Sequence, residues 1–324
     1  MTRRQPFLDT TSRRRHRRRN LVQSVLLLGG MLGLLALCAW VLFGGAAAFW
    51  ALAGWGIALL ISPRASPRLV LRLYGGTRLT PHSFPQGFAI LEQLTRRAEI
   101  DHVPSFWYVP SPIMNAFTMG RGEHVAVAVT DGMISALNAR EFTGVLAHEL
   151  SHIRNGDLWV MMLADSIGRL TNLMTIAGGL LLIINLPLLL LGRAQVSWTF
   201  ILLLLFAPTV ANLLQMGLSR AREYDADLEA AALTGDPAGL ASGLNKLEHQ
   251  GAGLWERIFM PGRRLPEPSL LRSHPPTQER IRRLLALYPP EPIDRFGETE
   301  PFELGGRHIP VRRRPRWRVT GLWH

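Results

Sequence analysis

The chain contains few cysteines and fewer acidic than basic residues, and both shortages narrow its class. Cys38 is the only cysteine among 324 residues, which excludes an intrachain disulfide and therefore a disulfide-stapled secreted domain. There are 24 Asp and Glu residues against 36 Lys and Arg residues, for a formal net charge of +12. A balance this basic indicates an anionic partner, either nucleic acid or an anionic lipid surface.

Charge is missing altogether from four long apolar runs. Each run is long enough to cross a hydrocarbon layer of about 30 Å as a helix. The alternative, a buried core helix, is less favoured because core helices rarely continue for twenty residues without a charge. The first run is too long for the core of a cleaved signal peptide, and a second follows at once. We therefore expect a mainly α membrane protein with four transmembrane helices, at 21–43, 45–62, 170–191 and 196–216.

Most of the arginines near these runs lie on one side of the expected membrane, and only Arg193 lies between the third and fourth runs. Those ahead of the first run are Arg3, Arg4, Arg13, Arg14, Arg15, Arg17, Arg18 and Arg19, whereas the segment between the first two runs is uncharged. The positive-inside rule then places the N-terminus, residues 63–165 and the chain after 217 in the cytoplasm. Nucleic-acid binding is the rival interpretation of the arginines. Their position beside a span favours anionic lipid instead, so we expect the bilayer as a partner and no nucleic acid.

The segments between and after the spans have the pattern of a small α+β domain. Residues 79–99 have helical apolar spacing, and β-prone pieces at 105–110, 114–120 and 124–130 suggest a small sheet. Asn138, with Glu141 three residues later, predicts a capped helix that ends near Asn155. We divide the chain into an N-terminal tail (1–20), two spans (21–62), a first part of the α+β domain (63–169), two spans (170–216), a second part of that domain (217–288), and a Pro/Arg-rich tail or appendage (289–324).

The segment HELSH at 148–152 has the spacing of a zinc site. His148 and His152 stand four apart, so on a helix both imidazoles point to the same side and can bind one metal ion. Glu149 is placed to accept a proton from water that attacks a peptide carbonyl, with zinc making that water more acidic. The alternative without a metal is an amphipathic helix with two histidines on one face. A third ligand elsewhere in the chain would favour the metal.

SRAREYDAD at 219–227 offers that ligand. Glu223 can complete a set of three and leave one position for water, and Asp227, one turn on, can accept a hydrogen bond from His148. The alternative for Glu223 is a surface ion pair with a neighbouring arginine. Other candidates for the third ligand are weaker, because they lack a carboxylate pattern or lie on the motif segment itself: His124, His249, His274 and Asp157.

Four pieces together resemble the HtpX-type membrane zinc metalloproteases, bacterial relatives of the type I CAAX prenyl proteases. They are NAFTMG (115–120), HELSHIRNGD (148–157), SRAREYDAD (219–227) and SHPPTQERI (273–281), in the family's order and with two spans between the second and third. The resemblance implies one Zn²⁺ per chain in a zincin-like cytoplasmic domain. It also implies an edge strand for substrate at Asn115, Ala116 and Phe117, and accessory roles for His274 and Arg280.

The resulting expectation is a zinc endopeptidase in the bacterial inner membrane. It would hydrolyse internal peptide bonds of misfolded or damaged membrane proteins at the cytoplasmic face. Two alternatives stay open at this point. One is a metal-stabilised membrane scaffold or sensor without catalysis, which the intact Glu149 argues against. The other is a processing peptidase with a narrow substrate. The sequence assigns no oligomeric state.

Overall fold

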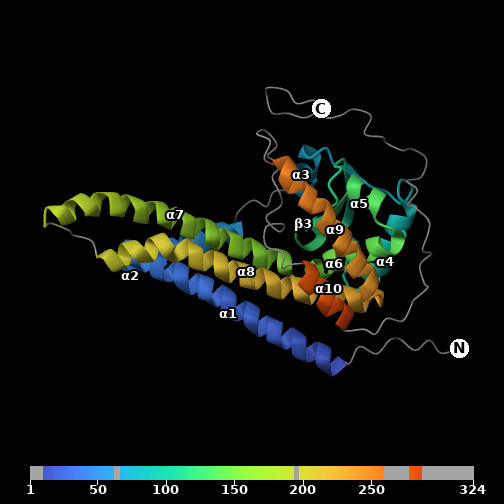
Figure 1. Ribbon diagram of the computed structural model, residues 1–324, viewed down its shortest axis with the longest axis horizontal. Coiled ribbons are helices and arrows are strands. Elements are labelled where there is room, and N and C mark those ends of the chain that lie inside the picture. The colour runs from blue at the N-terminus through green and yellow to red at the C-terminus, as the bar shows by residue number, and fades with distance from the viewer. Residues whose placement is uncertain (1–9, 62–65, 193–196, 259–276, 287–324) are drawn as a thin grey trace.

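Long helices project from a compact α+β unit in the computed structural model of the protein, which describes residues 10–61, 66–192, 197–258 and 277–286 (Figure 1). The helices are α1 (Thr10–Phe43), α2 (Gly45–Ile61), α3 (Pro67–Leu73), α4 (Pro85–Arg97), α5 (Asp131–Ala136), α6 (Ala139–Asn155), α7 (Asp157–Leu190), α8 (Trp198–Thr234), α9 (Pro237–Ile258) and α10 (Thr277–Ala286). The strands are β1 (Thr77–Arg78), β2 (Ser105–Val109), β3 (Ala116–Met119) and β4 (Ala126–Thr130), with a short 3₁₀ turn at Gly122–His124.

Three of the described helices are long and apolar enough to span a membrane, namely α1, α7 and α8. The sequence predicted four spans. The remaining one corresponds to α2, which is apolar but has only 17 residues. The start of α1 also differs from expectation, because the helix begins at Thr10 and takes in most of the arginine-rich segment that was expected to be a tail. Span and basic segment thus form one helix.

Helix α8 runs without a break from Trp198 to Thr234. The sequence analysis treated the fourth span and the segment 218–235 as separate helices, but neither Gly217, which lies between them, nor Pro208 ends the helix. Gly235, in the left-handed conformation, closes it as predicted. The expected domain boundary near residue 216 therefore lies inside a helix, and Glu223 is carried on a rigid extension of a membrane helix.

The sheet has the order β1-β2-β4-β3, with β2 and β4 parallel and the two outer pairs antiparallel. Alternate residues of β4 face opposite sides. Val127 and Val129 join the main core with α4, α6 and α9, whereas Ala126 and Ala128 join a smaller cluster on the other face. This arrangement leaves β3 as an edge strand, and β3 packs against α6.

Helix α4 begins six residues later than the apolar spacing predicted. The expected start was residue 79, but the Leu79 N–H donates a hydrogen bond to the Phe106 carbonyl and so continues the pairing of β1 with β2. The chain then turns, and the helix starts at Pro85, which supplies the fixed φ of a first helical residue. Strand β1 was not predicted, because two residues are too few for a period-two pattern.

Helix α6, which carries HELSH, begins with the predicted capping box. The Asn138 side chain accepts from the Glu141 N–H, and Glu141 accepts from the Asn138 N–H. Glu141 is buried and also accepts hydrogen bonds from Ser242 (2.7 Å) and Lys246 (2.6 Å) of α9. Burial opposes ionisation of Glu141, but the bonds from Lys246, Ser242 and Asn138 outweigh it and lower its pKa. The start of α6 is thereby fixed to α9.

We expect Glu141→Gln to destabilise the metal-free protein at neutral pH by about 1–3 kcal/mol, the cost of disrupting a buried hydrogen-bonded group. The folded pKa of Glu141 lies below the unfolded value, so its contribution is complete above the unfolded pKa and is lost as the pH falls through the folded pKa. The difference between wild type and variant in thermal unfolding, measured in detergent, should shrink between pH 6 and pH 3.5. A difference that stays constant over that range would contradict this account.

Candidate metal centre and active site

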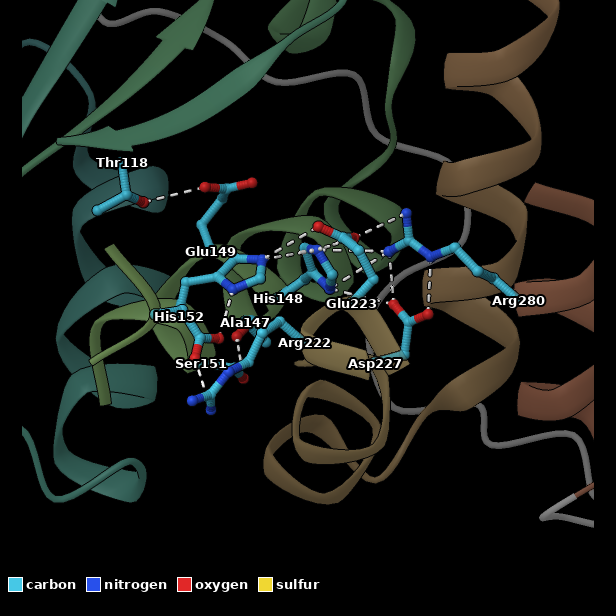
Figure 2. Close-up of polar contacts among 11 residues, drawn as sticks. Thr118, Ala147, His148, Glu149, Ser151, His152, Arg222, Glu223, Asp227 and Arg280 are labelled. Atoms are coloured by element: carbon cyan, nitrogen blue, oxygen red, sulfur yellow. Dashed lines mark hydrogen bonds and ion pairs between the residues drawn. The ribbon is translucent and has the colours of Figure 1, made fainter. Parts of the chain in front are cut away.

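The two histidines of α6 face each other. Their Nε2 atoms are 3.2 Å apart, and the ring centroids lie 4.8 Å apart (Figure 2). Two imidazole ligands of one tetrahedral zinc, each about 2.0–2.1 Å from the ion, would hold their nitrogens about 3.3 Å apart. The observed separation between His148 and His152 matches that requirement.

Each histidine has its other ring nitrogen occupied by a carboxylate. The Nδ1 of His148 lies 3.1 Å from Asp227, and the Nδ1 of His152 lies 2.8 Å from Asp157. A carboxylate at Nδ1 fixes the neutral tautomer in which Nδ1 donates and Nε2 presents a lone pair. Both lone pairs then point into the same space, where they repel each other unless a cation lies between them.

Glu223 of α8 supplies the third group. Its carboxylate oxygens lie 3.3 Å from Nε2 of His148 and 3.7 Å from Nε2 of His152, and the residue is buried. One ligand atom from each of the three residues falls within 4.8 Å of the others. Two imidazoles and one carboxylate are a donor set that zinc takes in hydrolytic enzymes. These residues therefore fit the ion.

Glu149 points from the same turn of α6 toward the sheet. Its Oε2 accepts a hydrogen bond of 3.0 Å from the hydroxyl of Thr118 on β3, as the close-up shows (Figure 2). Glu149 is half-buried, while Thr118 is buried. The bond orients the carboxylate beside the histidine pair without making it part of the metal cluster.

Arg280 of α10 reaches the centre from the side opposite β3 (Figure 2). Its guanidinium donates to both oxygens of Asp227, at 2.6 and 2.7 Å, and lies 3.2 Å from Glu223. The Nη2 atom is also 3.3 Å from Nε2 of His148. Only 4 % of Arg280 is exposed, so its charge is balanced by these two carboxylates and not by water.

These contacts change the proton affinity of the histidines. Burial alone would lower the pKa of His148, but its hydrogen bonds to Asp227 and Glu223 outweigh burial and raise the pKa to about 9. For His152, burial also lowers the pKa, and the bond to Asp157 reverses the direction. Without a metal ion the pair therefore holds a proton at neutral pH. A metal ion entering the centre must displace that proton.

Comparison with known proteins decides the family. The model of the family described as "Peptidase family M48" matches residues 81–288 of the chain. The chain belongs to peptidase family M48. It is 33% identical over 298 residues to a "Protease HtpX homolog" of Acaryochloris marina, covering 83% of this chain and 94% of that protein. It is also 34% identical over 289 residues to one of Acidiphilium cryptum, covering 82% and 96%.

Family M48 membership confirms two expectations from the sequence, the resemblance to HtpX-type proteases and a metalloprotease activity. With its apolar helices the chain is a membrane metalloprotease. Among solved structures, "Crystal Structure of S. mikatae Ste24p" matches with 18% identity and a TM-score of 0.43, covering 83% of this chain and 66% of that one.

The structure brings most of the predicted site residues together. His148, Glu149, His152, Glu223, Asp227 and Arg280 meet at the centre just described. The residues predicted for substrate binding lie at the start of the edge strand, where the half-buried Asn115 precedes β3. The side chain of Phe117 packs with Leu71 on the opposite face of the sheet, so it does not face the metal centre. His274 lies outside the described residues.

The sequence analysis missed three contributors, Asp157, Arg222 and Thr118. Asp157 was weighed only as a metal ligand and set aside because it lies on the motif segment. Gly156, left-handed at φ 69°, ends α6 and turns the chain so that Asp157 reaches back to His152. Arg222 lies 3.0 Å from the other oxygen of Asp157. The Gly-Asp pair right after the motif was the available signal.

We expect Asp157→Asn to weaken zinc binding by about 10- to 100-fold, because the amide does not fix the His152 tautomer as a carboxylate does. The fold should persist, since asparagine has the same shape. Zinc affinity can be measured by competition with a chromophoric chelator in detergent. Asp101→Asn, on an exposed turn, is the matched control and should bind zinc as wild type does. Equal zinc affinities of wild type and both variants would show that Asp157 does not support zinc binding.

Proposed function

We propose that the chain is a zinc endopeptidase that hydrolyses internal peptide bonds of misfolded or damaged membrane proteins at the cytoplasmic face of the bacterial inner membrane. In this proposal His148, His152 and Glu223 hold the ion, and Glu149 is the general base and acid. Asp227 and Asp157 position the two imidazoles. The observation that carries the proposal is the 3.2 Å approach of two Nε2 atoms whose Nδ1 partners are both carboxylates, with Glu149 beside them.

Zinc bound there would polarise the scissile carbonyl and make water acidic enough to attack at neutral pH. Glu149 takes the proton from the attacking water. It later passes that proton to the amide nitrogen as the C–N bond breaks. The Thr118 hydroxyl holds one carboxylate oxygen, which keeps the other turned toward the reacting atoms. The hydrogen bond from β3 thus holds Glu149 in position before the substrate arrives.

The edge position of β3 supports a broad substrate range. An extended peptide can add to β3 as another strand, held by main-chain hydrogen bonds that read little sequence. Such binding requires an unfolded segment, which a damaged protein offers and a native one does not. Because Glu149 is tied to β3 through Thr118, a peptide on this edge would lie along the catalytic carboxylate.

Two features support action at the cytoplasmic membrane surface. Metal-site residues lie next to membrane helices, since α7 begins at Asp157 and Glu223 is on the same helix as the span before it. The arginines ahead of the first span, with Arg64, Arg68 and Arg72 after the second, favour a cytoplasmic location for both ends of this pair. Substrates embedded in the same bilayer would therefore approach at the height of the site.

Reconstitution in vesicles tests the proposal. The zinc-loaded full-length protein is incubated with one membrane protein in two forms, the native form and a variant destabilised in its membrane domain. We expect cleavage at several internal bonds of the destabilised form and little of the native one. Cleavage of a single defined bond, whatever the folding state, would instead indicate a processing peptidase. Absence of any cleavage with zinc bound would indicate a metal-stabilised scaffold.

A further inference from the structure

A small cavity lies beside the catalytic carboxylate and is walled on one side by a membrane helix. Glu149, His152 and Glu223 line its catalytic side. Leu158 and Met161, from the first turns of α7, line the other. Its volume is about 20 Å³, which leaves room for roughly one water molecule. The cavity therefore joins the reacting centre to the beginning of a transmembrane helix.

Little polar surface is exposed inside this cavity. Asp157 and Arg222 contact the cavity, but their charges pair with each other at 3.0 Å. The Thr118 hydroxyl donates to Glu149. What is left for an entering group is the apolar surface of Leu158 and Met161. A charged side chain would lose its hydration against that apolar surface, whereas an uncharged one would not.

The position of the cavity relates it to the substrate. A peptide bond cleaved with Glu149 as base must lie within hydrogen-bond reach of that carboxylate, directly or through one water. Side chains of an extended peptide alternate between two faces, and Thr118 of the edge strand itself borders the cavity. The side chain of a residue flanking the cleaved bond thus has this cavity as its nearest space on the metal side.

We propose that the cavity receives an uncharged side chain of the residue adjoining the cleaved bond, and that Met161 sets the size of side chain accepted. This inference rests on the proposed function. Met161 is 9% exposed and also packs with Met31 and Leu35 of α1. Its unbranched thioether chain can shift between rotamers, so the pocket takes small side chains as it stands and larger ones only when Met161 moves.

The neighbouring methionine provides a matched control. Met162 is 43% exposed and does not line the cavity. The test uses the full-length zinc-loaded protein in detergent with denatured casein, and mass spectrometry maps each cleaved bond. The readout is the ratio of cleavages beside Phe and Leu to cleavages beside Ala and Ser. A ratio does not depend on how much of a variant is folded, so loss of packing against α1 does not obscure the result.

We expect Met161→Ala to raise the ratio about tenfold and Met161→Phe to lower it about tenfold, the effect of a few methylene groups in an apolar pocket. Met162→Ala should leave it unchanged. Cleavage that persists with the same ratio in both Met161 variants would contradict the proposed role of the cavity but not the proposed protease activity. Zinc-loaded wild type that cleaves nothing would overturn the proposed function, and the pocket with it.

Discussion

Replacing Glu149 with glutamine should lower peptide-bond cleavage by about 10³-fold while leaving zinc in place. Glutamine keeps the size of the side chain, and its carbonyl can still accept the hydrogen bond from Thr118. It cannot take a proton from water or return one to the leaving amine. Since Glu149 is outside the three-residue metal cluster, the ion should be retained.

The measurement pairs cleavage of a fluorescent casein with the zinc content of each preparation. Glu123→Gln is the control, because that glutamate is 77% exposed on its side chain and lies in the turn between β3 and β4. It should behave as wild type. If Glu149→Gln cleaved at the wild-type rate, proton transfer by this carboxylate would be excluded. If it lost zinc, Glu149 would have to be counted among the ligands.

The second large effect concerns Arg280, whose replacement by methionine should destabilise the metal-free protein by about 3–5 kcal/mol. The guanidinium contacts both Asp227 and Glu223, and its charge is permanent. Its burial lowers its pKa, but the two carboxylates outweigh burial and raise it, so it stays charged. Removing it leaves two buried carboxylates that His148 compensates only in part, and thermal unfolding in detergent measures the loss.

A double variant separates this electrostatic cost from lost packing. Asp227→Asn combined with Arg280→Met removes one buried charge of each sign, so the pair should recover part of the stability lost in Arg280→Met alone. Arg282→Met is the matched control, because that side chain is 76% exposed on the same helix. Strictly additive effects of the two site substitutions would show that Asp227 and Arg280 do not stabilise each other.

Local chemistry made much of this architecture predictable. The capping box at Asn138, the end of α6 at Asn155 and the left-handed Gly235 each depend on residues within one or two turns. The HELSH spacing likewise fixes two imidazoles on one face of a helix. Glu223 could be proposed from its motif because the chemistry demanded a third ligand, and the structure places it beside both histidines.

Other features depend on contacts that no local pattern reports. The contact between Asp157 and His152 requires a turn at Gly156. A glycine in the sequence predicts that turn but not the direction of the helix that follows it. The approach of Thr118 to Glu149 depends on the packing of an edge strand against α6, across 31 residues of sequence. The continuity of α8 was missed because hydropathy falls where the helix leaves the apolar layer, although its hydrogen bonding does not change.

The most direct test of the central claim is the zinc content per chain of purified wild type beside Glu223→Ala. The account predicts one zinc per wild-type chain and near loss of the ion in the variant, because two imidazoles alone leave the site without its third ligand. Zinc retained equally by both proteins would contradict the assignment of Glu223, and a wild type free of zinc after loading would contradict the metal centre itself.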